Sequence, residues 1–285
     1  MWDEEGDDQV GKKRILRSYL VFTYYKSWLD NLIVEGPSGD AIFDTGLVDE
    51  NYDNIYCYLK RNQDGTEGRN RKWVVGYFAC WGKGKKGKTL TKGFPRKPNP
   101  PEYIDRNHLE DLILDTSKEI YCDWEHIVDD NFSRLPLDFL DRVLGFNHEI
   151  RNLIQEIREN EDEADRRKLK EIAADGGYNQ RLIISALRQA QEVAEKYVRW
   201  NYKTAVPIYW ARKNRLSLLL PLNLCSPNNA ADLALVVSPG YIGGYQGETI
   251  LTINMAYKDA RLVCRPCSEW LNMRRASFDD AEEAE

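Results

Sequence analysis

The chain has 285 residues, enough for one large domain or two small ones, and 42% hydrophobic and 11% aromatic residues predict a substantial core. Its formal net charge of −6 argues against strong nonspecific binding to duplex nucleic acid. No long apolar run indicates a membrane span, and the acidic opening MWDEEGDDQV lacks the apolar core of a secretion signal. We therefore expect an intracellular protein, cytoplasmic or nuclear.

Acid-rich stretches at both ends, residues 1–12 and 277–285, predict disordered tails. Between them we expect a single α+β domain over residues 13–276. Its first element is a helix, because Leu16 and Leu20 begin an apolar stripe with helical spacing. A break at GPSGD follows, and the next three stretches predict a short strand in AIFDTGL, a helix in NYDNIYCYLKRN and a strand in KWVVGYFACW.

A basic segment follows the last of these strands. Residues 69–101 contain ten basic side chains, no acid, and interleaved aromatic residues that include Trp73, Tyr77, Trp81 and Phe94. Glycine and proline break residues 82–101, which predicts an inserted mobile loop that can follow a phosphate backbone, while the aromatic rings suit unpaired bases. The competing interpretation is a solvated loop on an acidic body. The residues predicted to bind nucleic acid here are Lys83, Lys85, Lys86, Lys88, Lys92, Arg96 and Lys97.

Residues 139–200 are rich in charged residues with apolar residues at helical spacing, and they predict a helical hairpin broken at Gly176-Gly177. In the second helix, Ile183 and Leu187 lie on one apolar stripe. Residues 158–177 are mostly charged, with both signs mixed. We expect this part to project from the body and to bury little surface.

The last third of the chain predicts a sheet. RLSLLLPLNL, DLALVVSP, GETILTINMAY and ARLVCRP are separated by short breakers, and the last two form a hairpin if Lys258-Asp259 is its turn. LSLLLPL is apolar at nearly every position, as in a strand buried on both faces. A largely antiparallel or mixed sheet, built from residues 73–80 and 216–266 and covered by helices, is the expected core. In GYIGGYQGET the glycines predict a flexible connection, and Tyr241 and Tyr245 are candidates for stacking on bases.

Three side chains are candidates for phosphodiester or phosphoryl chemistry. His126 lies in a polar stretch with Arg134, so one group can move a proton while the other neutralises phosphate charge. Lys203 follows a long predicted helix and can contact a phosphate or act as a nucleophile. The structural alternatives are a histidine that caps a helix and a lysine that complements a helix dipole. Catalysis requires all three to converge in one pocket.

Carboxylates lie near the ends of predicted strands and loops, where two or more of them can bind Mg²⁺. Asp44 and Asp130 are the candidate ligands of such a site. The spacing does not require a metal, and no other cofactor is indicated. Cys264 and Cys267 form a C-x-x-C pair without a second pair or histidines at ligand spacing, so they are interpreted as thiols in a reducing compartment.

Several stretches together resemble an uncharacterised family of bacteria and eukaryotes, domain of unknown function 3825. They include IFDTGLVDENYDNIYCYL, HIVDDNFSRLP, NYKTAVPIYW, LSLLLPLNL and YQGETILTINMAYKDARLVCRPCSEWL. The resemblance covers most of residues 14–271 and is most specific in the last third. It implies no established reaction. It does imply a context, because bacterial members of the family occur beside RNA-binding and RNA-processing domains.

These observations leave three hypotheses. The first is an enzyme of RNA processing or nucleotide-phosphate chemistry, acting on single-stranded RNA or a nucleotide through His126, Arg134 and Lys203. The second is a noncatalytic RNA-binding module, and the third is a protein-interaction scaffold that uses the helical hairpin. The sequence does not indicate an oligomeric state.

Overall fold

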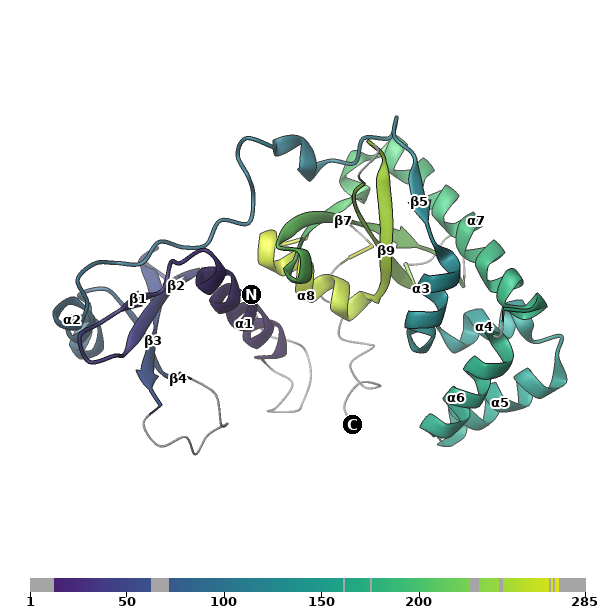
Figure 1. Ribbon diagram of the computed structural model, residues 1–285, viewed down its shortest axis with the longest axis horizontal. Helices are drawn as coiled ribbons and strands as arrows, with labels where there is room; N and C mark the ends of the chain where they lie inside the picture. Colours follow the sequence, from purple (N-terminus) through teal and green to yellow (C-terminus); the bar gives the residue numbers. More distant parts are fainter. Residues whose placement is uncertain are drawn as a thin grey trace. The chain divides into compact units, whose positions relative to one another are not determined.

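The computed structural model describes residues 13–62, 72–160, 162–174, 176–225, 231–240, 243–266, 268, 270 and 271. The predicted disordered tails lie outside these residues. The predicted α+β class is confirmed, with helices and two separate sheets. The internal contacts divide the chain after Tyr103 into an N-terminal unit, residues 13–103, and a C-terminal unit that begins at residue 104 (Figure 1). The sequence predicted one domain, but each unit has its own sheet and its own buried clusters.

The N-terminal unit is built on a four-stranded antiparallel sheet of order β1-β2-β3-β4. Its elements are α1 (Arg14–Leu29), β1 (Val34–Glu35), β2 (Ala41–Val48), β3 (Asn54–Arg61), β4 (Trp73–Cys80) and α2 (Gly84–Gly93). Helix packing covers both faces of this sheet. Phe43 of β2 meets Tyr24 of α1 edge to face, with ring centroids 5.6 Å apart. On the opposite face, Ile42 and Tyr56 cluster with Leu90 of α2.

Strand β3 replaces the helix that the sequence predicted in NYDNIYCYLKRN. It pairs antiparallel with β2 on one side and with β4 on the other, so its backbone groups are satisfied by long-range hydrogen bonds. Tyr56, Cys57 and Leu59 are all buried, because both faces of the sheet are covered. Apolar residues on successive positions therefore reflect burial on two faces and not a helical stripe.

The C-terminal unit is built on a five-stranded mixed sheet of order β5-β9-β8-β7-β6, antiparallel except where β5 runs parallel to β9. The strands are β5 (Ile120–Cys122), β6 (Val206–Trp210), β7 (Arg215–Leu222), β8 (Leu233–Pro239) and β9 (Tyr245–Thr252). The helices are α3 (Trp124–Asn131), α4 (Leu137–Leu144), α5 (His148–Asn160), α6 (Glu163–Ala173), α7 (Tyr178–Trp200) and α8 (Ile253–Val263), with short 3-10 turns η2 (Leu109–Leu112), η3 (Phe132–Arg134), η4 (Tyr202–Thr204) and η5 (Ala211–Lys213).

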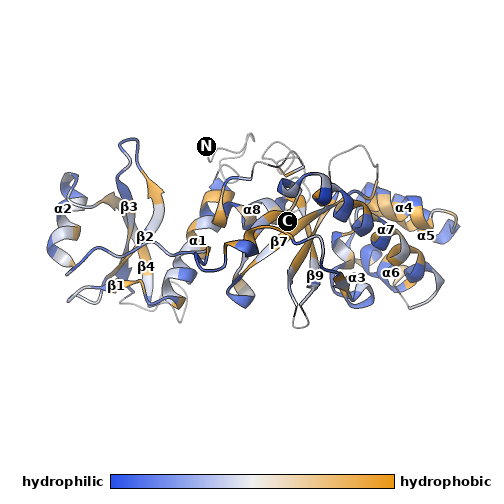
Figure 2. Ribbon diagram, turned by 90° about the horizontal axis from the view of Figure 1, so that it is seen from above, coloured by the Kyte–Doolittle hydropathy of each residue, from blue (hydrophilic) through white to orange (hydrophobic). Residues whose placement is uncertain are grey.

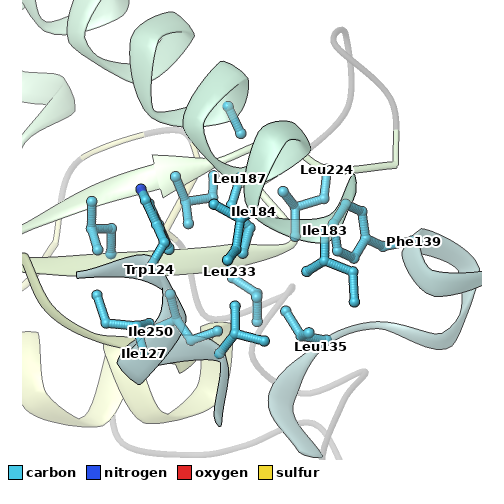
Figure 3. Close-up of a cluster of buried hydrophobic side chains, with 14 of the residues drawn as sticks. Trp124, Ile127, Leu135, Phe139, Ile183, Ile184, Leu187, Leu224, Leu233 and Ile250 are labelled. Atoms are coloured by element: carbon cyan, nitrogen blue, oxygen red, sulfur yellow. The ribbon is translucent and has the colours of Figure 1, made fainter. Parts of the chain in front are cut away.

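The main core joins α3, α4 and α7 to one face of the sheet. Figure 3 shows Trp124 of α3, Phe139 of α4 and Ile183 of α7 meeting Leu233 and Ile250 of the strands. Strand β7 is buried at every position after its first and is coloured as hydrophobic in Figure 2, so the predicted double-sided burial is confirmed. None of the described helices is long and apolar enough to cross a membrane.

The predicted break at Gly176-Gly177 does separate α6 from α7, but the prediction that residues 158–177 bury little surface is wrong. Residues 139–200 contain the end of α4 and three further helices, α5, α6 and α7. Leu169 and Ala173 of α6 are 1% and 0% exposed and belong to the same core as Ile157 of α5. Apolar residues recur every three or four positions among the charged residues. Helices α5 and α6 therefore bury an apolar stripe and expose their charged side to solvent.

Helix α8 replaces the second strand of the predicted C-terminal hairpin. Strand β9 ends at Thr252, whose hydroxyl accepts a hydrogen bond from the backbone N–H of Met255 and thereby caps the helix. Ile253, Ala256 and Tyr257 are buried at helical spacing. Lys258 and Asp259, the predicted turn, therefore lie inside α8.

Candidate nucleic-acid interface

The basic segment predicted as a mobile loop contains a helix. Residues 84–93 form α2 although Gly84, Gly87 and Gly93 are poor helix formers. Leu90 is 0% exposed and packs with Phe94, which follows the helix, on the aromatic face of the sheet. Tertiary packing of this one apolar stripe therefore holds a helix that its own propensity does not favour.

Three lysines form one face of α2. Lys85, Lys88 and Lys92 recur at i, i+3 and i+7, on the side of the helix opposite Gly87 and Leu90. All three side chains are exposed, and among the described residues no ion pair joins them to a carboxylate. We call Lys85, Lys88 and Lys92 the α2 lysine face. It is a surface of uncompensated positive charge on an acidic chain.

The other predicted basic residues have different environments. Lys83 forms an ion pair with Asp53, and this hydrogen bond raises the pKa of the lysine. Lys86 lies with its Nζ 5.0 Å from the centre of the Tyr77 ring. Arg96 and Lys97 are exposed in the extended chain after α2. Lys83 is therefore engaged within the unit, and Lys86 lies over Tyr77, apart from the lysine face.

The arrangement of charge on α2 opposes helix stability. Lysines three and four residues apart repel one another, and Lys85 and Lys86 lie at the helix N-terminus, where the helix dipole favours anions. No acidic residue lies in the first turn. A bound polyanion relieves both unfavourable interactions, and water or salt relieves them only by screening.

Aromatic rings lie directly beneath and beside this helix. Tyr58 and Tyr77 stack with ring centroids 4.6 Å apart, and Trp81, half-buried just before α2, meets Tyr56 at 5.9 Å. Of the two tyrosines predicted to stack on bases, Tyr241 lies outside the described residues. Tyr245 belongs to β9 in the C-terminal unit, and its hydroxyl accepts a hydrogen bond from the backbone N–H of Asp115 at 2.9 Å.

The structure does not bring the three predicted catalytic residues together. His126 of α3 is highly exposed and lies 3.3 Å from Asp130, one turn later on the same helix. It follows β5, one edge of the sheet, whereas Lys203 precedes β6, the opposite edge. Three strands lie between these edges, so four inter-strand spacings separate them by about 19 Å. A cavity of about 240 Å³ between η3, α4 and α6 has none of the three in its lining.

Arg134 joins a polar cluster of its own. Its Nη1 donates to the backbone carbonyl of Ile250 at 2.6 Å and to the hydroxyl of Thr249 at 3.2 Å. The Thr249 hydroxyl donates in turn to Asn131 at 3.0 Å. Burial raises the pKa of the nearby Asp259 carboxyl to about 7, against the opposing effects of Lys258 and Arg134. Arg134 therefore ties η3 to β9.

The candidate magnesium ligands have structural roles in different units. Asp44 is buried, and burial raises its pKa. Its two oxygens accept hydrogen bonds from the Gly46 backbone N–H at 2.8 Å and from the Asn54 side chain at 2.9 Å. Asp130 pairs with His126. Within the described ranges, no group of three or more His, Cys, Asp or Glu side chains is placed to hold a metal ion.

Sequence reasoning missed two residues that the structure places in unusual environments. Trp200 at the end of α7 is 79% exposed, and Asp259 is a carboxyl with a perturbed pKa inside α8. Trp200 lies outside the apolar stripe of its helix, and this position in the sequence could have predicted an exposed ring. Asp259 carried no local signal, because only the packing of α8 against other elements desolvates it.

The family model described as Domain of unknown function (DUF3825) matches residues 1–270. The chain belongs to the DUF3825 family. This confirms the resemblance found in the sequence. No curated protein and no solved structure matches the chain.

Proposed function

We propose that this DUF3825 protein is a noncatalytic module that binds single-stranded RNA through the α2 lysine face. The observation that carries the proposal is the alignment of Lys85, Lys88 and Lys92 on one exposed side of α2, without carboxylate partners among the described residues. Three fixed positive charges on a short helix suit successive phosphates of one strand. Lys86 within α2 and Arg96 and Lys97 after it add further positive charge to this part of the chain.

A single strand fits this surface better than a duplex does. The half-buried ring of Trp81 borders the helix, and an aromatic ring beside cations suits strands whose bases are unpaired. The whole chain is acidic, which weakens nonspecific attraction to duplexes. RNA is favoured over DNA only by the context of the family.

Catalysis is not part of the proposal. An RNA-processing or nucleotide-phosphate enzyme would need a proton-transfer group and a phosphate-binding cation in one place. His126 and Lys203 lie at opposite edges of the sheet, and Arg134 is engaged with Thr249 and Ile250. Helices α5 and α6 are packed into the core, which leaves the scaffold hypothesis without the free hairpin on which it depended.

The test measures fluorescence anisotropy of a labelled oligouridylate of about twelve nucleotides at several salt concentrations. The variant carries Lys85→Gln, Lys88→Gln and Lys92→Gln. Each lysine that neutralises a phosphate contributes about −0.7 to the slope of log affinity against log salt, so the variant should lose about 2 from the magnitude of that slope. Binding at low salt should fall strongly.

The matched control carries the same loss of three charges at Lys118→Gln, Lys168→Gln and Lys170→Gln, whose ammonium groups form ion pairs with aspartates. Control affinity should stay close to that of the unmodified protein. Equal losses in both variants would mean that net charge alone governs binding. That result, or the absence of binding to any single strand at low salt, contradicts the proposal.

A further inference from the structure

The C-terminal end of α7 presents two aromatic side chains to solvent. Trp200 is 79% exposed and Tyr202, in the following turn η4, is 57% exposed. Tryptophan is buried on average to a large extent, so two aromatic residues only two positions apart with this exposure are unusual. We call Trp200 and Tyr202 the aromatic pair.

The backbone beneath the aromatic pair is held firmly. The Asn201 side chain accepts a hydrogen bond from the Lys203 N–H, and the Asn201 N–H donates to the carbonyl of Tyr197 at 2.9 Å. The Trp270 indole donates to the carbonyl of Thr204 at 2.8 Å. The indole of Trp200 also meets the Tyr197 ring edge to face at 5.8 Å. The two rings are therefore displayed from a fixed frame, which lowers the entropic cost of binding.

Charges of both signs surround the aromatic pair. Arg199 and Lys203 are exposed beside it, and the Lys203 ammonium lies 5.9 Å from the Tyr202 ring. Glu192 and Glu195 lie one to two turns earlier on α7, and Glu195 accepts a hydrogen bond from Gln191. Lys196 is also exposed, one turn before Trp200 on α7, so the site offers flat rings with a few cationic side chains for phosphate contacts.

We propose that Trp200 and Tyr202 stack on unpaired bases of a single strand, with Arg199 and Lys203 contacting its phosphates. This inference rests on the proposed function and deepens it, because it adds a base-recognition site on the C-terminal unit to the phosphate contacts of α2. Paired bases in a duplex hide their faces from such rings, so the ligand class is single-stranded nucleic acid. The two sites should differ in their response to salt.

The experiment compares the variant Trp200→Ala/Tyr202→Ala with the unmodified protein on the same oligouridylate. Each stacked base is worth roughly five-fold to 150-fold in affinity, so the variant should bind at least about five-fold more weakly at every salt concentration. The slope against salt should stay unchanged. An oligomer of the same ribose-phosphate backbone without bases should bind the variant and the unmodified protein equally.

Two further variants isolate the rings. Trp200→Phe/Tyr202→Phe keeps two stacking surfaces and should retain most of the affinity. Tyr121→Ala/Tyr178→Ala removes two other exposed rings, 66% and 64% exposed, and should bind as the unmodified protein does.

The outcomes separate the two proposals. Loss of binding in the α2 lysine variant with full binding in the Trp200→Ala/Tyr202→Ala variant would overturn this inference and leave the proposed function standing. A lowered salt slope in the aromatic variant, or equal weakening on the oligomer without bases, would also overturn stacking. Weakened base-dependent binding with an unchanged slope supports it.

Discussion

Gly87 of α2 lies so close to the carbonyl oxygen of Cys80 at the end of β4 that a Cβ added to Gly87 would stand 2.1 Å from that oxygen. No real Cβ tolerates this distance, so any side chain at this position must push α2 away from β4. The backbone N–H of Gly82 also donates to the carbonyl of Gly87 at 3.0 Å. This contact fixes the helix that carries the α2 lysine face.

The variant Gly87→Ala should therefore lower both the melting temperature and the affinity for single-stranded RNA, although every lysine remains. Gly93→Ala is the matched control, because a Cβ there meets nothing within 4 Å. Alanine is the better helix former by roughly 0.5–1 kcal/mol, so the control should be as stable as the unmodified protein or more so. Thermal unfolding and anisotropy measure the two effects. Equal behaviour of both variants would show that the position of α2 does not depend on Gly87.

Helix α6 provides a second test, because the sequence predicted that its region buries little. Leu169 is 1% exposed within the main core, so Leu169→Ala should destabilise the C-terminal unit by about 2–5 kcal/mol. The exposed neighbour Lys168→Ala should cost much less than Leu169→Ala, since its pair with Asp165 is at the surface. Chemical denaturation compares the two variants. A small loss of unfolding free energy in Leu169→Ala would contradict the packing of α6 in the main core.

The elements that the sequence predicted correctly share one property: their apolar residues follow a pattern that fits only one type of secondary structure. The helix α1 and the uninterrupted apolar run of β7 were of this kind, although α1 buries Ile15, Tyr19 and Thr23 and not the predicted stripe that begins at Leu16 and Leu20. Strand β3 was mistaken for a helix because short runs with Tyr56, Cys57 and Leu59 fit either period. Its pairing with β2 and β4, which lie elsewhere in the chain, decides the structure.

The candidate site was predictable in composition and not in shape. Charge counting identified the lysines of residues 83–97, but only the burial of Leu90 and the close approach of Gly87 make a helix with a lysine face. The convergence of His126 with Lys203 failed for the opposite reason. Local polarity identified both residues, whereas the order of five strands places them at opposite edges of one sheet.

The N-terminal cap of α8 provides a test that the residues after β9 form a helix and not the predicted strand. Thr252→Ala removes the hydroxyl that accepts from the Met255 N–H and should cost about 0.5–2 kcal/mol of unfolding free energy. Thr252→Ser keeps the hydroxyl and should cost much less. Denaturant titration compares the three proteins. If residues 253–263 formed a strand, the two substitutions would not separate in this way.

Asp259 gives the DUF3825 protein a predictable response to pH. Burial raises the pKa of this carboxyl from 3.8 to about 7. Between about pH 4 and pH 7 the folded protein thus holds a proton that the unfolded chain has released. Stability consequently falls as pH rises through this window and stays at the lower level above it.

The variant Asp259→Asn keeps a neutral side chain at all pH values, so it should match the unmodified protein near pH 4 and exceed its stability at pH 8. The full shift corresponds to at most about 4 kcal/mol at 1.36 kcal/mol for each pKa unit. Asp115→Asn is a control whose effect on stability should have the opposite sign, because hydrogen bonds from Ser117 lower the pKa of that exposed carboxyl. Its removal should slightly lower stability above about pH 4, where the aspartate is charged. Melting temperatures from pH 4 to pH 8 measure both variants, and a gain for Asp259→Asn that is the same at every pH would contradict a buried carboxyl that titrates near neutrality.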